Sequence, residues 1–429
     1  MSRVVQKFGG SSVADADSIK RVAKRVLATK QAGNDVVVVI SAMGDTTDDL
    51  LDLALQVSPM PAARELDMLL TTGERQSAAL LAMALHDLGV EAKSYTGSQA
   101  GVITTGKHGD ARIIDITPGR IETSLGEGSI VIVAGFQGVS QDTKDVTTLG
   151  RGASDTTAVA LAAALGAEYC EIYTDVDGIF TADPRICPKA RQVPEISYEE
   201  MMELAASGAK VLHLRCVEYA RRENVKIHVR SSFSDRPGTW VMDLADISPL
   251  TDKEGNPMEQ PLISGVAHTL SEAQITVVGV PDRVGEAATI FDAIAGRGIN
   301  IDTIVQNVSR ISSNRTDISF TLATADARAA METLTAIQEE VGFEELLFDD
   351  QIGKVSVIGV GMKSHPGVTA RFFRALADAG VNLGMISTSE IRISVVVDAG
   401  SVQQAVQAAH EAFGLDSDGE AVVYAGTGR

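Results

Sequence analysis

Apolar positions in the first half of the chain alternate between the spacing of strands and the spacing of helices. Short runs of β-branched residues at Val4–Phe8 and Val36–Ser41 are typical of buried strands. Between these runs, Ser18–Lys30 places its apolar residues at helical spacing, and Gly33 with Asn34 ends the predicted helix. Further helices are expected around Leu50–Leu55 and over Glu74–Leu88 and Asp155–Leu165, and further strands at Ser129–Ala134 and Glu171–Thr174. This alternation predicts a mainly parallel α/β sheet with helices on both faces.

The alternation stops near residue 245, and the chain beyond it repeats itself. Residues 246–262 contain prolines and charges without periodicity, which is typical of an interdomain linker. After this segment, Ile275–Val280 is similar to Val355–Val360. Each copy continues with a glycine-containing turn, an amphipathic helix, a Gly-x-Asn strand entry, a second strand and a second helix. The pattern predicts a βαββαβ unit of about 80 residues that occurs twice.

Composition and charge restrict the classes of function. The chain has 429 residues, which suggests about three domains. Its formal net charge of −20 and its 4% of aromatic residues argue against a broad surface for nucleic acid or anionic lipid. The three cysteines have no spacing typical of a metal or redox site, so we expect reduced thiols. No signal segment and no apolar run of membrane-spanning length occurs, so we expect a cytoplasmic protein without a membrane partner.

The turn Lys7–Ser12 (KFGGSS) joins the first predicted strand to the first predicted helix. Gly9 and Gly10 let backbone N–H groups approach an anion, and the helix that follows adds the positive end of its dipole. Lys7 adds a point charge beside this cradle. The same residue types also build a plain strand-to-helix turn, so the sequence leaves both interpretations open.

Two further segments have both a structural and a functional interpretation. Thr71–Glu74 (TTGE) fits a capping box, but Glu74 is also suited to bind a substrate ammonium group. A second glycine-rich turn (GRGASDTT) begins at residue 150 and enters a helix. Its Arg151 is suited to hold a carboxylate through two hydrogen bonds, whereas Ser154 or Asp155 is suited to cap the helix.

Three familiar motifs are excluded or incomplete. Gly101–His108 nearly matches a P-loop, but the last position requires a hydroxyl group for Mg²⁺ and holds His108. No complete G-x-G-x-x-G occurs, which disfavours a dinucleotide-dependent dehydrogenase. Thr174–Arg185 follows a strand as a polar loop, where open α/β sheets bind ligands, but its acidic residues do not complete a calcium loop.

Five segments together carry a family resemblance. They are Lys7–Ser12, Thr71–Glu74, Thr148–Asp155, Tyr173–Gly178 and Gly208–Leu212. Their content and order resemble the amino acid kinase family, and within it the aspartate kinases, over nearly the whole chain. The repeated C-terminal unit is similar to a tandem pair of ACT domains, which are small-molecule sensors. The resemblance implies an amino acid kinase fold over residues 1–245, a linker over 246–262, and two α+β ferredoxin-like ACT domains over 263–345 and 346–429.

The resemblance implies transfer of the γ-phosphoryl group of MgATP to the β-carboxylate of L-aspartate, the first step toward lysine, threonine and methionine. The acceptor carboxylate is already ionised at pH 7 and must approach a polyanion, so positioning and charge neutralisation are the expected sources of catalysis. The implied catalytic residues are Lys7 and Asp155, with Asp155 orienting Lys7 or the metal. Mg²⁺ is expected to keep mainly phosphate and water ligands, so no protein ligand is assigned to it.

The resemblance also implies binding roles. The implied nucleotide-binding residues are Lys7, Phe8, Gly9, Gly10, Ser41, Ser154, Thr174, Asp175, Phe180, Asp183, Arg185, Lys210 and Val211. The implied aspartate-binding residues are Asp45, Thr46, Thr47, Glu74, Arg151, Gly152, Ala153 and Ser154. Among them, Glu74 pairs with the ammonium group and Arg151 with the α-carboxylate, so the resemblance favours a functional role for Glu74 over the capping box.

The ACT resemblance implies effector sites where the two copies meet. The first copy contributes Asn300, Ile301, Asp302 and Gln306, and the second contributes Thr369, Ala370, Asn382, Leu383, Ser389 and Glu390. Asp302 aligns with Gly384, so the second copy lacks a carboxylate for an effector ammonium group, and we expect the first copy to supply more contacts. The sequence leaves open whether lysine, threonine or both act as effectors.

The ACT pair also bears on assembly. Exposed ACT sheet edges tend to pair between chains, so a homodimer or a larger assembly is expected. Met258 is a candidate internal start for a short regulatory subunit. The alternative is that both units serve only for dimerisation.

Two other functions fit the sequence less well. A kinase for glutamate, N-acetylglutamate or a nucleoside monophosphate shares the fold, but Glu74 and Arg151 together suit a free amino acid. A regulatory amino-acid sensor with an inert kinase half is disfavoured, because Lys7, Arg151 and Asp155 are all present.

Overall fold

The computed structural model describes residues 2–150, 152–248, 262–307, 314–362, 365 and 367–424. The chain divides into two compact units. Unit 1 comprises Met1–Ala206, Lys210–Gln260 and Ser417–Arg429, and unit 2 comprises Ser207–Ala209 and Pro261–Asp416. Arg151, Met258 and most of the expected linker lie outside the described residues.

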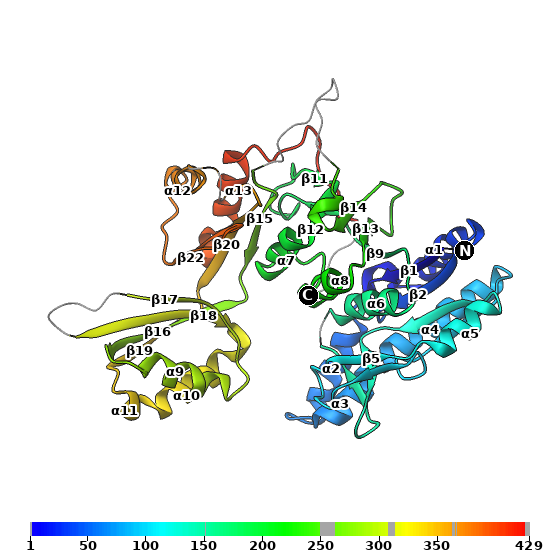
Figure 1. Cartoon of the computed structure of the whole chain (residues 1–429), viewed down its shortest axis with the longest axis horizontal. Helices are drawn as coiled ribbons and strands as arrows, with labels where there is room; N and C mark the ends of the chain where they lie inside the picture. The colour runs from blue at the N-terminus through cyan, green and yellow to red at the C-terminus, as the bar shows by residue number, and fades with distance from the viewer. Residues whose placement is uncertain are drawn as a thin grey trace. The chain divides into compact units, whose positions relative to one another are not determined.

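Unit 1 is built on an eight-stranded sheet in the order β12-β14-β13-β9-β1-β2-β6-β3. Figure 1 labels the strands from β12 to β2 of this order. All neighbouring pairs are parallel except β13 with β14. The β-branched runs predicted this sheet correctly, because strands of a parallel sheet are buried on both faces. Its strands are β1 (Arg3–Phe8), β2 (Asp35–Ile40), β3 (Ala92–Tyr95), β6 (Ile130–Ala134), β9 (Tyr169–Thr174), β12 (Glu195–Ser197), β13 (Ile227–Ser231) and β14 (Thr239–Met242).

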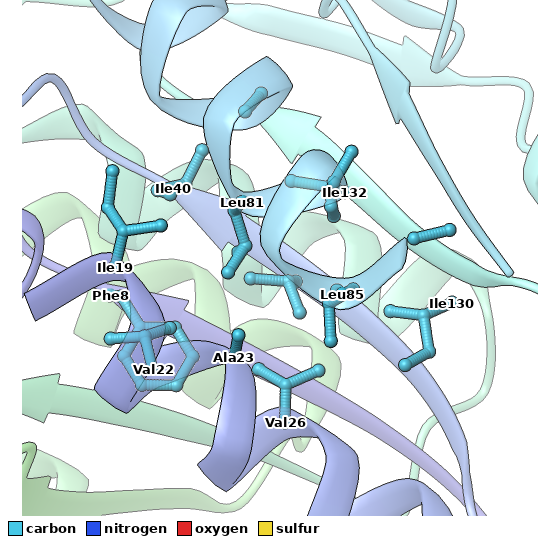
Figure 2. Close-up of a cluster of buried hydrophobic side chains, with 14 of the residues drawn as sticks. Phe8, Ile19, Val22, Ala23, Val26, Ile40, Leu81, Leu85, Ile130 and Ile132 are labelled. Atoms are coloured by element: carbon cyan, nitrogen blue, oxygen red, sulfur yellow. The ribbon is translucent and has the colours of Figure 1, made fainter. Parts of the chain in front are cut away.

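Helices cover both faces of this sheet. On one face, α1 and α4 pack over Phe8 and Ile132, and Leu81 of α4 lies in the same hydrophobic cluster (Figure 2). Val37 and Val39 alternate with the residues of that cluster and are buried on the opposite face, where α6 packs against β1, β2 and β9. The helices of unit 1 are η1 (Gly10–Val13), α1 (Ala16–Gln31), α2 (Thr46–Val57), α3 (Ala63–Leu70), α4 (Thr72–Asp87), α5 (Gly119–Gly126), α6 (Ala153–Ala164), α7 (Tyr198–Ala206), α8 (Leu214–Glu223) and η2 (Leu244–Asp246).

Two small sheets complete unit 1. One has the order β5-β4-β7-β8, with β4 (Val102–Thr104), β5 (Ile113–Ile116), β7 (Gln137–Ser140) and β8 (Val146–Thr148). The other pairs β10 (Ile179–Phe180) with β11 (Gln192–Val193). Since β4 lies inside the P-loop-like segment, that segment is strand and turn with no helix behind it, which agrees with rejecting it as a P-loop.

The described part of unit 2 contains two four-stranded antiparallel sheets packed against helices. The first has the order β17-β18-β16-β19 and the second the order β15-β20-β22-β21. Gly285 and Gly367 cap α9 and α12 at equivalent places, each with φ in the left-handed region, at 106° and 107°. The strands are β15 (Gly265–Thr269), β16 (Glu272–Pro281), β17 (Ile301–Gln306), β18 (Arg315–Ala323), β19 (Glu345–Asp349), β20 (Ile352–Ile358), β21 (Ile386–Thr388) and β22 (Arg392–Asp398). The helices are α9 (Glu286–Ala295), η3 (Thr324–Asp326), α10 (Ala327–Ala336), α11 (Gln338–Val341), α12 (Val368–Asp378), η5 (Ala399–Ser401) and α13 (Val402–Ala412).

The predicted repeat is wrong for one strand. The first copy has the βαββαβ order and ends in β19, but no strand follows α13 to complete the second sheet among the residues that the structure describes. Instead β15, which precedes the first copy in sequence, pairs antiparallel with β20. The physical reason is that the chain after Asp416 belongs to unit 1, which leaves the edge of β20 free to pair with β15.

All three cysteines are buried, and none of them forms a disulfide. No helix in the described part of the chain combines the length and the apolar character that crossing a membrane requires.

Candidate active site

The candidate site lies where β1, β2 and β9 end side by side. Because these strands are parallel, the turns after Phe8, Ile40 and Thr174 meet at one edge of the sheet, which is where open α/β sheets bind ligands. The turns are joined by backbone hydrogen bonds: Gly9 N–H donates to the carbonyl of Tyr173, and Ser41 N–H donates to the carbonyl of Phe8.

The glycine turn after β1 packs directly on the turn after β2. Gly44 N–H donates to the carbonyl of Gly10 at 3.1 Å. A Cβ at Gly10 would lie 2.9 Å from the carbonyl oxygen of Gly44, so any larger residue would push the two turns apart. The structure therefore brings Lys7–Gly10 and Ser41–Thr47 together, as the proposed roles in phosphate and aspartate binding require.

The first long helix, α1, does not directly follow the glycine turn. The turn leads into the short η1, whereas α1 begins only at Ala16. The Asp15 carboxylate caps α1 by accepting the backbone N–H of Ser18 at 2.7 Å, and this hydrogen bond lowers the pKa of Asp15. The long helix expected directly behind the glycine turn thus begins only at Ala16, with Asp15 as its N-cap and η1 between the turn and the helix.

Lys7 and Asp155 form an ion pair with 2.7 Å between Nζ and Oδ1. Both side chains are largely buried, and Asp155 lies in the first turn of α6. A Cβ at Gly9 would lie 3.4 Å from Lys7 Nζ, which places the ammonium group beneath the glycine turn. Both partners have lost most of their water shells, so each depends on the other for compensation of its charge. This pairing holds the Lys7 ammonium group in one position.

Glu74 is a buried carboxylate. Its side chain is 3% exposed; Oε1 accepts the backbone N–H of Ala42 at 3.2 Å, while Oε2 has no hydrogen-bond partner among the residues that the structure describes. Burial raises the pKa of Glu74 to about 7. The capping-box interpretation is wrong, because α3 runs almost directly into α4 and the Thr71 hydroxyl donates to the carbonyl of Met68 instead of capping the helix.

The other expected aspartate-binding residues surround Glu74 and the start of α6. A Cβ at Gly73 would lie 3.5 Å from Cγ2 of Thr46, so the turn Asp45–Thr47 is close to the first turn of α4. Ala153 and Ser154 are buried in the first turn of α6. Gly152 is the N-cap of that helix and no side chain caps it, so neither Ser154 nor Asp155 is the cap.

Arg151 is not described, but the two glycines beside it are. Gly150 and Gly152 both have φ in the left-handed region, at 87° and 71°. A Cβ at Gly152 would lie 2.8 Å from His213 Cδ2, so there is no room for a larger residue at this position. Before this turn, the carbonyl of Leu149 accepts a hydrogen bond from Arg215 Nη1 at 2.7 Å. Both ends of the turn are therefore held in place.

Asp67 supports the same turn and was not identified from the sequence. This buried carboxylate accepts hydrogen bonds from the Thr148 hydroxyl at 2.6 Å and the Gly109 N–H at 3.2 Å, and it contacts His108 Nδ1 at 2.7 Å. It thereby joins the loop around His108 to the end of β8, two residues before Gly150. A single Asp in an amphipathic helix gives no signal of such a role.

The loop after β9 brings part of the expected nucleotide set together. Arg185 forms ion pairs with Asp175 and Asp183, each at 3.6 Å, and its backbone N–H donates to Asp183 at 2.9 Å. The Thr174 hydroxyl donates to Asp175, and Phe180 lies in β10. Lys210 is exposed and Val211 is half-buried between α7 and α8, and the described contacts do not join them to this group.

The expected effector residues lie in unit 2, and Asp302 has a partner that the sequence analysis missed. Asp302 of β17 forms an ion pair with the buried Lys354 of β20, which also pairs with Glu272. Burial alone would raise the pKa of Asp302, but the charge and hydrogen bond of Lys354, with a contribution from Arg392, lower it. Thr369 and Ala370 lie in the first turn of α12, Asn382 and Leu383 precede β21, and Ser389 and Glu390 precede β22.

Comparison with known proteins agrees with this arrangement. A sequence profile of the amino acid kinase family matches residues 2–231, and a profile of the ACT domain matches residues 275–337 and 355–413. An aspartokinase of Mycolicibacterium smegmatis is 65% identical over 430 residues, which cover 100% of both chains.

Solved structures of E. coli aspartokinase III are similar at 26% sequence identity. The crystal structure in complex with aspartate and ADP, in the R-state, has a TM-score of 0.80, and the match covers 95% of this chain and 99% of that chain. The complex with lysine and aspartate, in the T-state, has a TM-score of 0.68 and covers 95% and 98%.

Proposed function

The chain belongs to the aspartokinases of the amino acid kinase family and is an ATP-dependent kinase with a carboxyl acceptor, and we propose that it converts L-aspartate and MgATP to 4-phospho-L-aspartate and ADP. The observation that carries this proposal is the buried Lys7–Asp155 pair at the sheet edge, with the unpaired Glu74 carboxylate oxygen beside the next turn. We further propose that residues 1–245 catalyse this reaction and that the two ACT units, over about 263–345 and 346–416, regulate it, since the chain after Asp416 belongs to unit 1 and not to the second ACT unit as expected. The product begins the synthesis of lysine, threonine and methionine.

Charge neutralisation by Lys7 is the main source of catalysis in this proposal. An ionised β-carboxylate must approach the γ-phosphate, and their mutual repulsion is the principal barrier to attack. Lys7 Nζ lies beneath Gly9, so a phosphate over the glycine turn receives the ammonium group together with backbone N–H groups of the turn other than that of Gly9, which donates to Tyr173. Asp155 orients Lys7, and no general base is required because the acceptor is already ionised.

Recognition of aspartate divides between two charged groups. Glu74 Oε2 accepts the substrate ammonium group, which compensates a carboxylate that burial otherwise destabilises. Arg151 holds the α-carboxylate through its planar guanidinium group. The turn Asp45–Thr47 and the first turn of α6, Gly152–Ser154, enclose the β-carboxylate between these charges.

The nucleotide is proposed to occupy the loop after β9. The E. coli relative binds ADP, and this chain shares its fold. The proposed contacts are Phe8, Ser41, Thr174, Asp175, Phe180, Asp183, Arg185, Lys210 and Val211.

Mg²⁺ is the metal that we propose to accompany ATP. The described residues contain no group of three or more His, Cys, Asp or Glu side chains that could hold a metal ion. We propose that this ion keeps mainly phosphate and water ligands and takes at most one carboxylate, such as Asp155, from the protein. When bound, this ion neutralises part of the negative charge on the phosphates.

The direct test is formation of an aspartyl hydroxamate from aspartate, MgATP and hydroxylamine. We expect product with aspartate, and little with glutamate or N-acetylaspartate, because the former is longer and the latter lacks the ammonium group. Turnover of another amino acid without turnover of aspartate would refute the proposal.

The pH dependence tests the role of Glu74. Because the pKa of Glu74 is raised to about 7, the free enzyme holds it protonated below that pH. We therefore expect kcat/KM for aspartate to rise up to about tenfold per pH unit below pH 7 and to level off above it. Glu74→Gln is expected to raise KM for aspartate and to abolish this inflection, whereas an unchanged inflection in the variant would contradict the assignment.

The raised pKa of Glu74 also predicts how the stability of the fold depends on pH. A carboxyl whose pKa is higher in the folded state stabilises the fold at pH values below its unfolded pKa, and this stabilisation is lost as pH rises to about 7. Bound aspartate restores it by pairing with the ionised group. The increase in Tm on adding aspartate should consequently be larger at pH 8 than at pH 6 in the native chain, with no such difference in Glu74→Gln.

Regulation is proposed to act through the first ACT copy more than the second. The E. coli relative binds lysine, and here Asp302 offers a carboxylate at a place where the second copy has Gly384. The proposed effector contacts are Asn300, Ile301, Asp302, Gln306, Thr369, Ala370, Asn382, Leu383, Ser389 and Glu390. We propose lysine, threonine or both as effectors, and a homo-oligomer as the working assembly, with Met258 as a start for a separate regulatory subunit.

Asp302→Asn tests this site. The concentration of lysine or threonine that gives half-maximal inhibition, measured singly and combined, is expected to rise about tenfold, because a charged hydrogen bond to the effector is lost. Lys354 keeps Glu272 as a partner, so the fold should persist. The exposed Asp350→Asn is the matched control, and equal inhibition of Asp302→Asn and Asp350→Asn would overturn the assignment.

A further inference from the structure

The chain segment after the second ACT copy returns to unit 1 and runs along the proposed nucleotide loop. Ser417 N–H donates to the carbonyl of Lys189 at 2.8 Å, and Ala421 N–H donates to that of Pro188 at 2.7 Å. Val423 then forms an antiparallel bridge with Val176. We refer to residues 417–424 as the C-terminal tail.

Tyr424 joins this tail to the loop by backbone and side chain. Its N–H donates to the carbonyl of Asp175 at 2.9 Å, and its hydroxyl donates to Asp177 Oδ2 at 3.2 Å. Its ring stacks on Phe233, with 5.9 Å between centroids and 9° between planes. The guanidinium group of Arg21 in turn lies 4.5 Å from the centre of the Phe233 ring.

Asp177 shows why the tail matters to the loop. Its carboxylate is fully buried, and its other partners are the Ser234 hydroxyl and Arg236, the latter at 3.3 Å. A buried carboxylate is stable only when its oxygens are paired, so loss of the Tyr424 hydroxyl leaves Asp177 with one partner fewer. The backbone has little room to adjust, because a Cβ at Gly178 would lie 2.5 Å from the Thr239 hydroxyl oxygen.

We propose that Tyr424 is a positioning residue for ATP: the C-terminal tail holds residues 175–178 in place, so that Asp175 and Arg185 keep the arrangement that binds the nucleotide. This inference rests on the proposed nucleotide role of the loop after β9. Since the tail directly follows unit 2 along the chain, it is covalently continuous with the ACT pair and hydrogen-bonded to the nucleotide loop.

Steady-state kinetics and ADP calorimetry on the full chain test this role. Tyr424→Phe is expected to raise KM for ATP and the Kd for ADP about fivefold, and Tyr424→Ala, which also loses the ring stack, about twentyfold. The kcat and the KM for aspartate should stay within twofold, because neither Lys7 nor Glu74 contacts the tail. A general loss of stability would not separate the two substrates in this way.

Tyr95→Phe is the matched control, because the Tyr95 hydroxyl also makes a single side-chain hydrogen bond in unit 1, to Ser124 at 2.7 Å, on the far edge strand β3. It should leave KM for ATP unchanged. Normal nucleotide binding in both Tyr424 variants would overturn the inference.

Arg185→Gln distinguishes a failure of the tail inference from a failure of the proposed nucleotide site. If Arg185→Gln weakens ADP binding while the Tyr424 variants do not, the tail has no positioning role and the nucleotide site stands. If Arg185→Gln leaves ADP binding unchanged, the nucleotide assignment itself fails, and the tail inference fails with it.

Discussion

Lys7→Ala is expected to lower kcat about a thousandfold while changing KM for aspartate little. The magnitude follows from removing one pre-organised positive donor from a site where charge develops during transfer. Lys7 is held by Asp155 at 2.7 Å before any substrate arrives, so no reorganisation is needed at the moment of reaction. The measurement is the initial rate of ADP release at saturating aspartate and MgATP.

Two controls make this result specific. Lys20→Ala removes an exposed lysine of α1 that pairs only loosely with Asp17, at 3.9 Å, and should leave kcat unchanged. Asp155→Asn keeps the volume of the side chain but loses the ion pair, so it should reduce kcat less than Lys7→Ala. The double variant should be no worse than Lys7→Ala alone, because residues that act as a unit are not additive. A folded Lys7→Ala enzyme with more than a tenth of native kcat would disprove the catalytic role.

The sheet and the edge that carries the site were predictable, because the apolar runs that indicate strands are also the segments buried between the two helical layers. Runs such as Val36–Ser41 are apolar on both faces, which only a strand between two helical layers can satisfy. Once the strands are parallel, the turns at Lys7–Ser12 and Thr174–Arg185 must lie at one edge. The contact between Lys7 and Asp155, which the family resemblance implied, follows from that edge and from the start of α6 behind it.

What the sequence could not predict depends on contacts between distant segments. Thr71–Glu74 matches a local capping signal, yet the structure buries Glu74 against Ala42, which lies 32 residues away. β15 completes the second ACT sheet because the chain after Asp416 leaves it, and a five-residue strand carries no mark of its partner. Lys354 does give a signal in the sequence. A lysine within a mostly apolar strand indicates that a carboxylate lies nearby, and the structure places Glu272 and Asp302 there.

Arg151→Ala is expected to raise KM for aspartate about a hundredfold and to lower kcat only modestly. Truncating one side of a buried, doubly hydrogen-bonded charge pair costs roughly 3 kcal/mol, which is about a hundredfold in affinity. Arg215 Nη1 donates to the carbonyl of Leu149 before the turn, and His213 packs on Gly152 after it, so the described residues on both sides of position 151 are held in place. Arg151→Lys keeps the charge but loses the planar fork, and should fall between the native and alanine enzymes.

Succinate, which is aspartate without its ammonium group, assigns the two recognition charges separately. If Arg151 holds the α-carboxylate, Arg151→Ala should raise the inhibition constant of succinate about as much as it raises KM for aspartate. Glu74→Gln should raise KM for aspartate but leave succinate inhibition unchanged, because Glu74 has nothing to pair with in that ligand. A near-normal KM in Arg151→Ala, or a Glu74→Gln enzyme that loses succinate as well, would mean that the two charges are assigned to the wrong ends of the substrate.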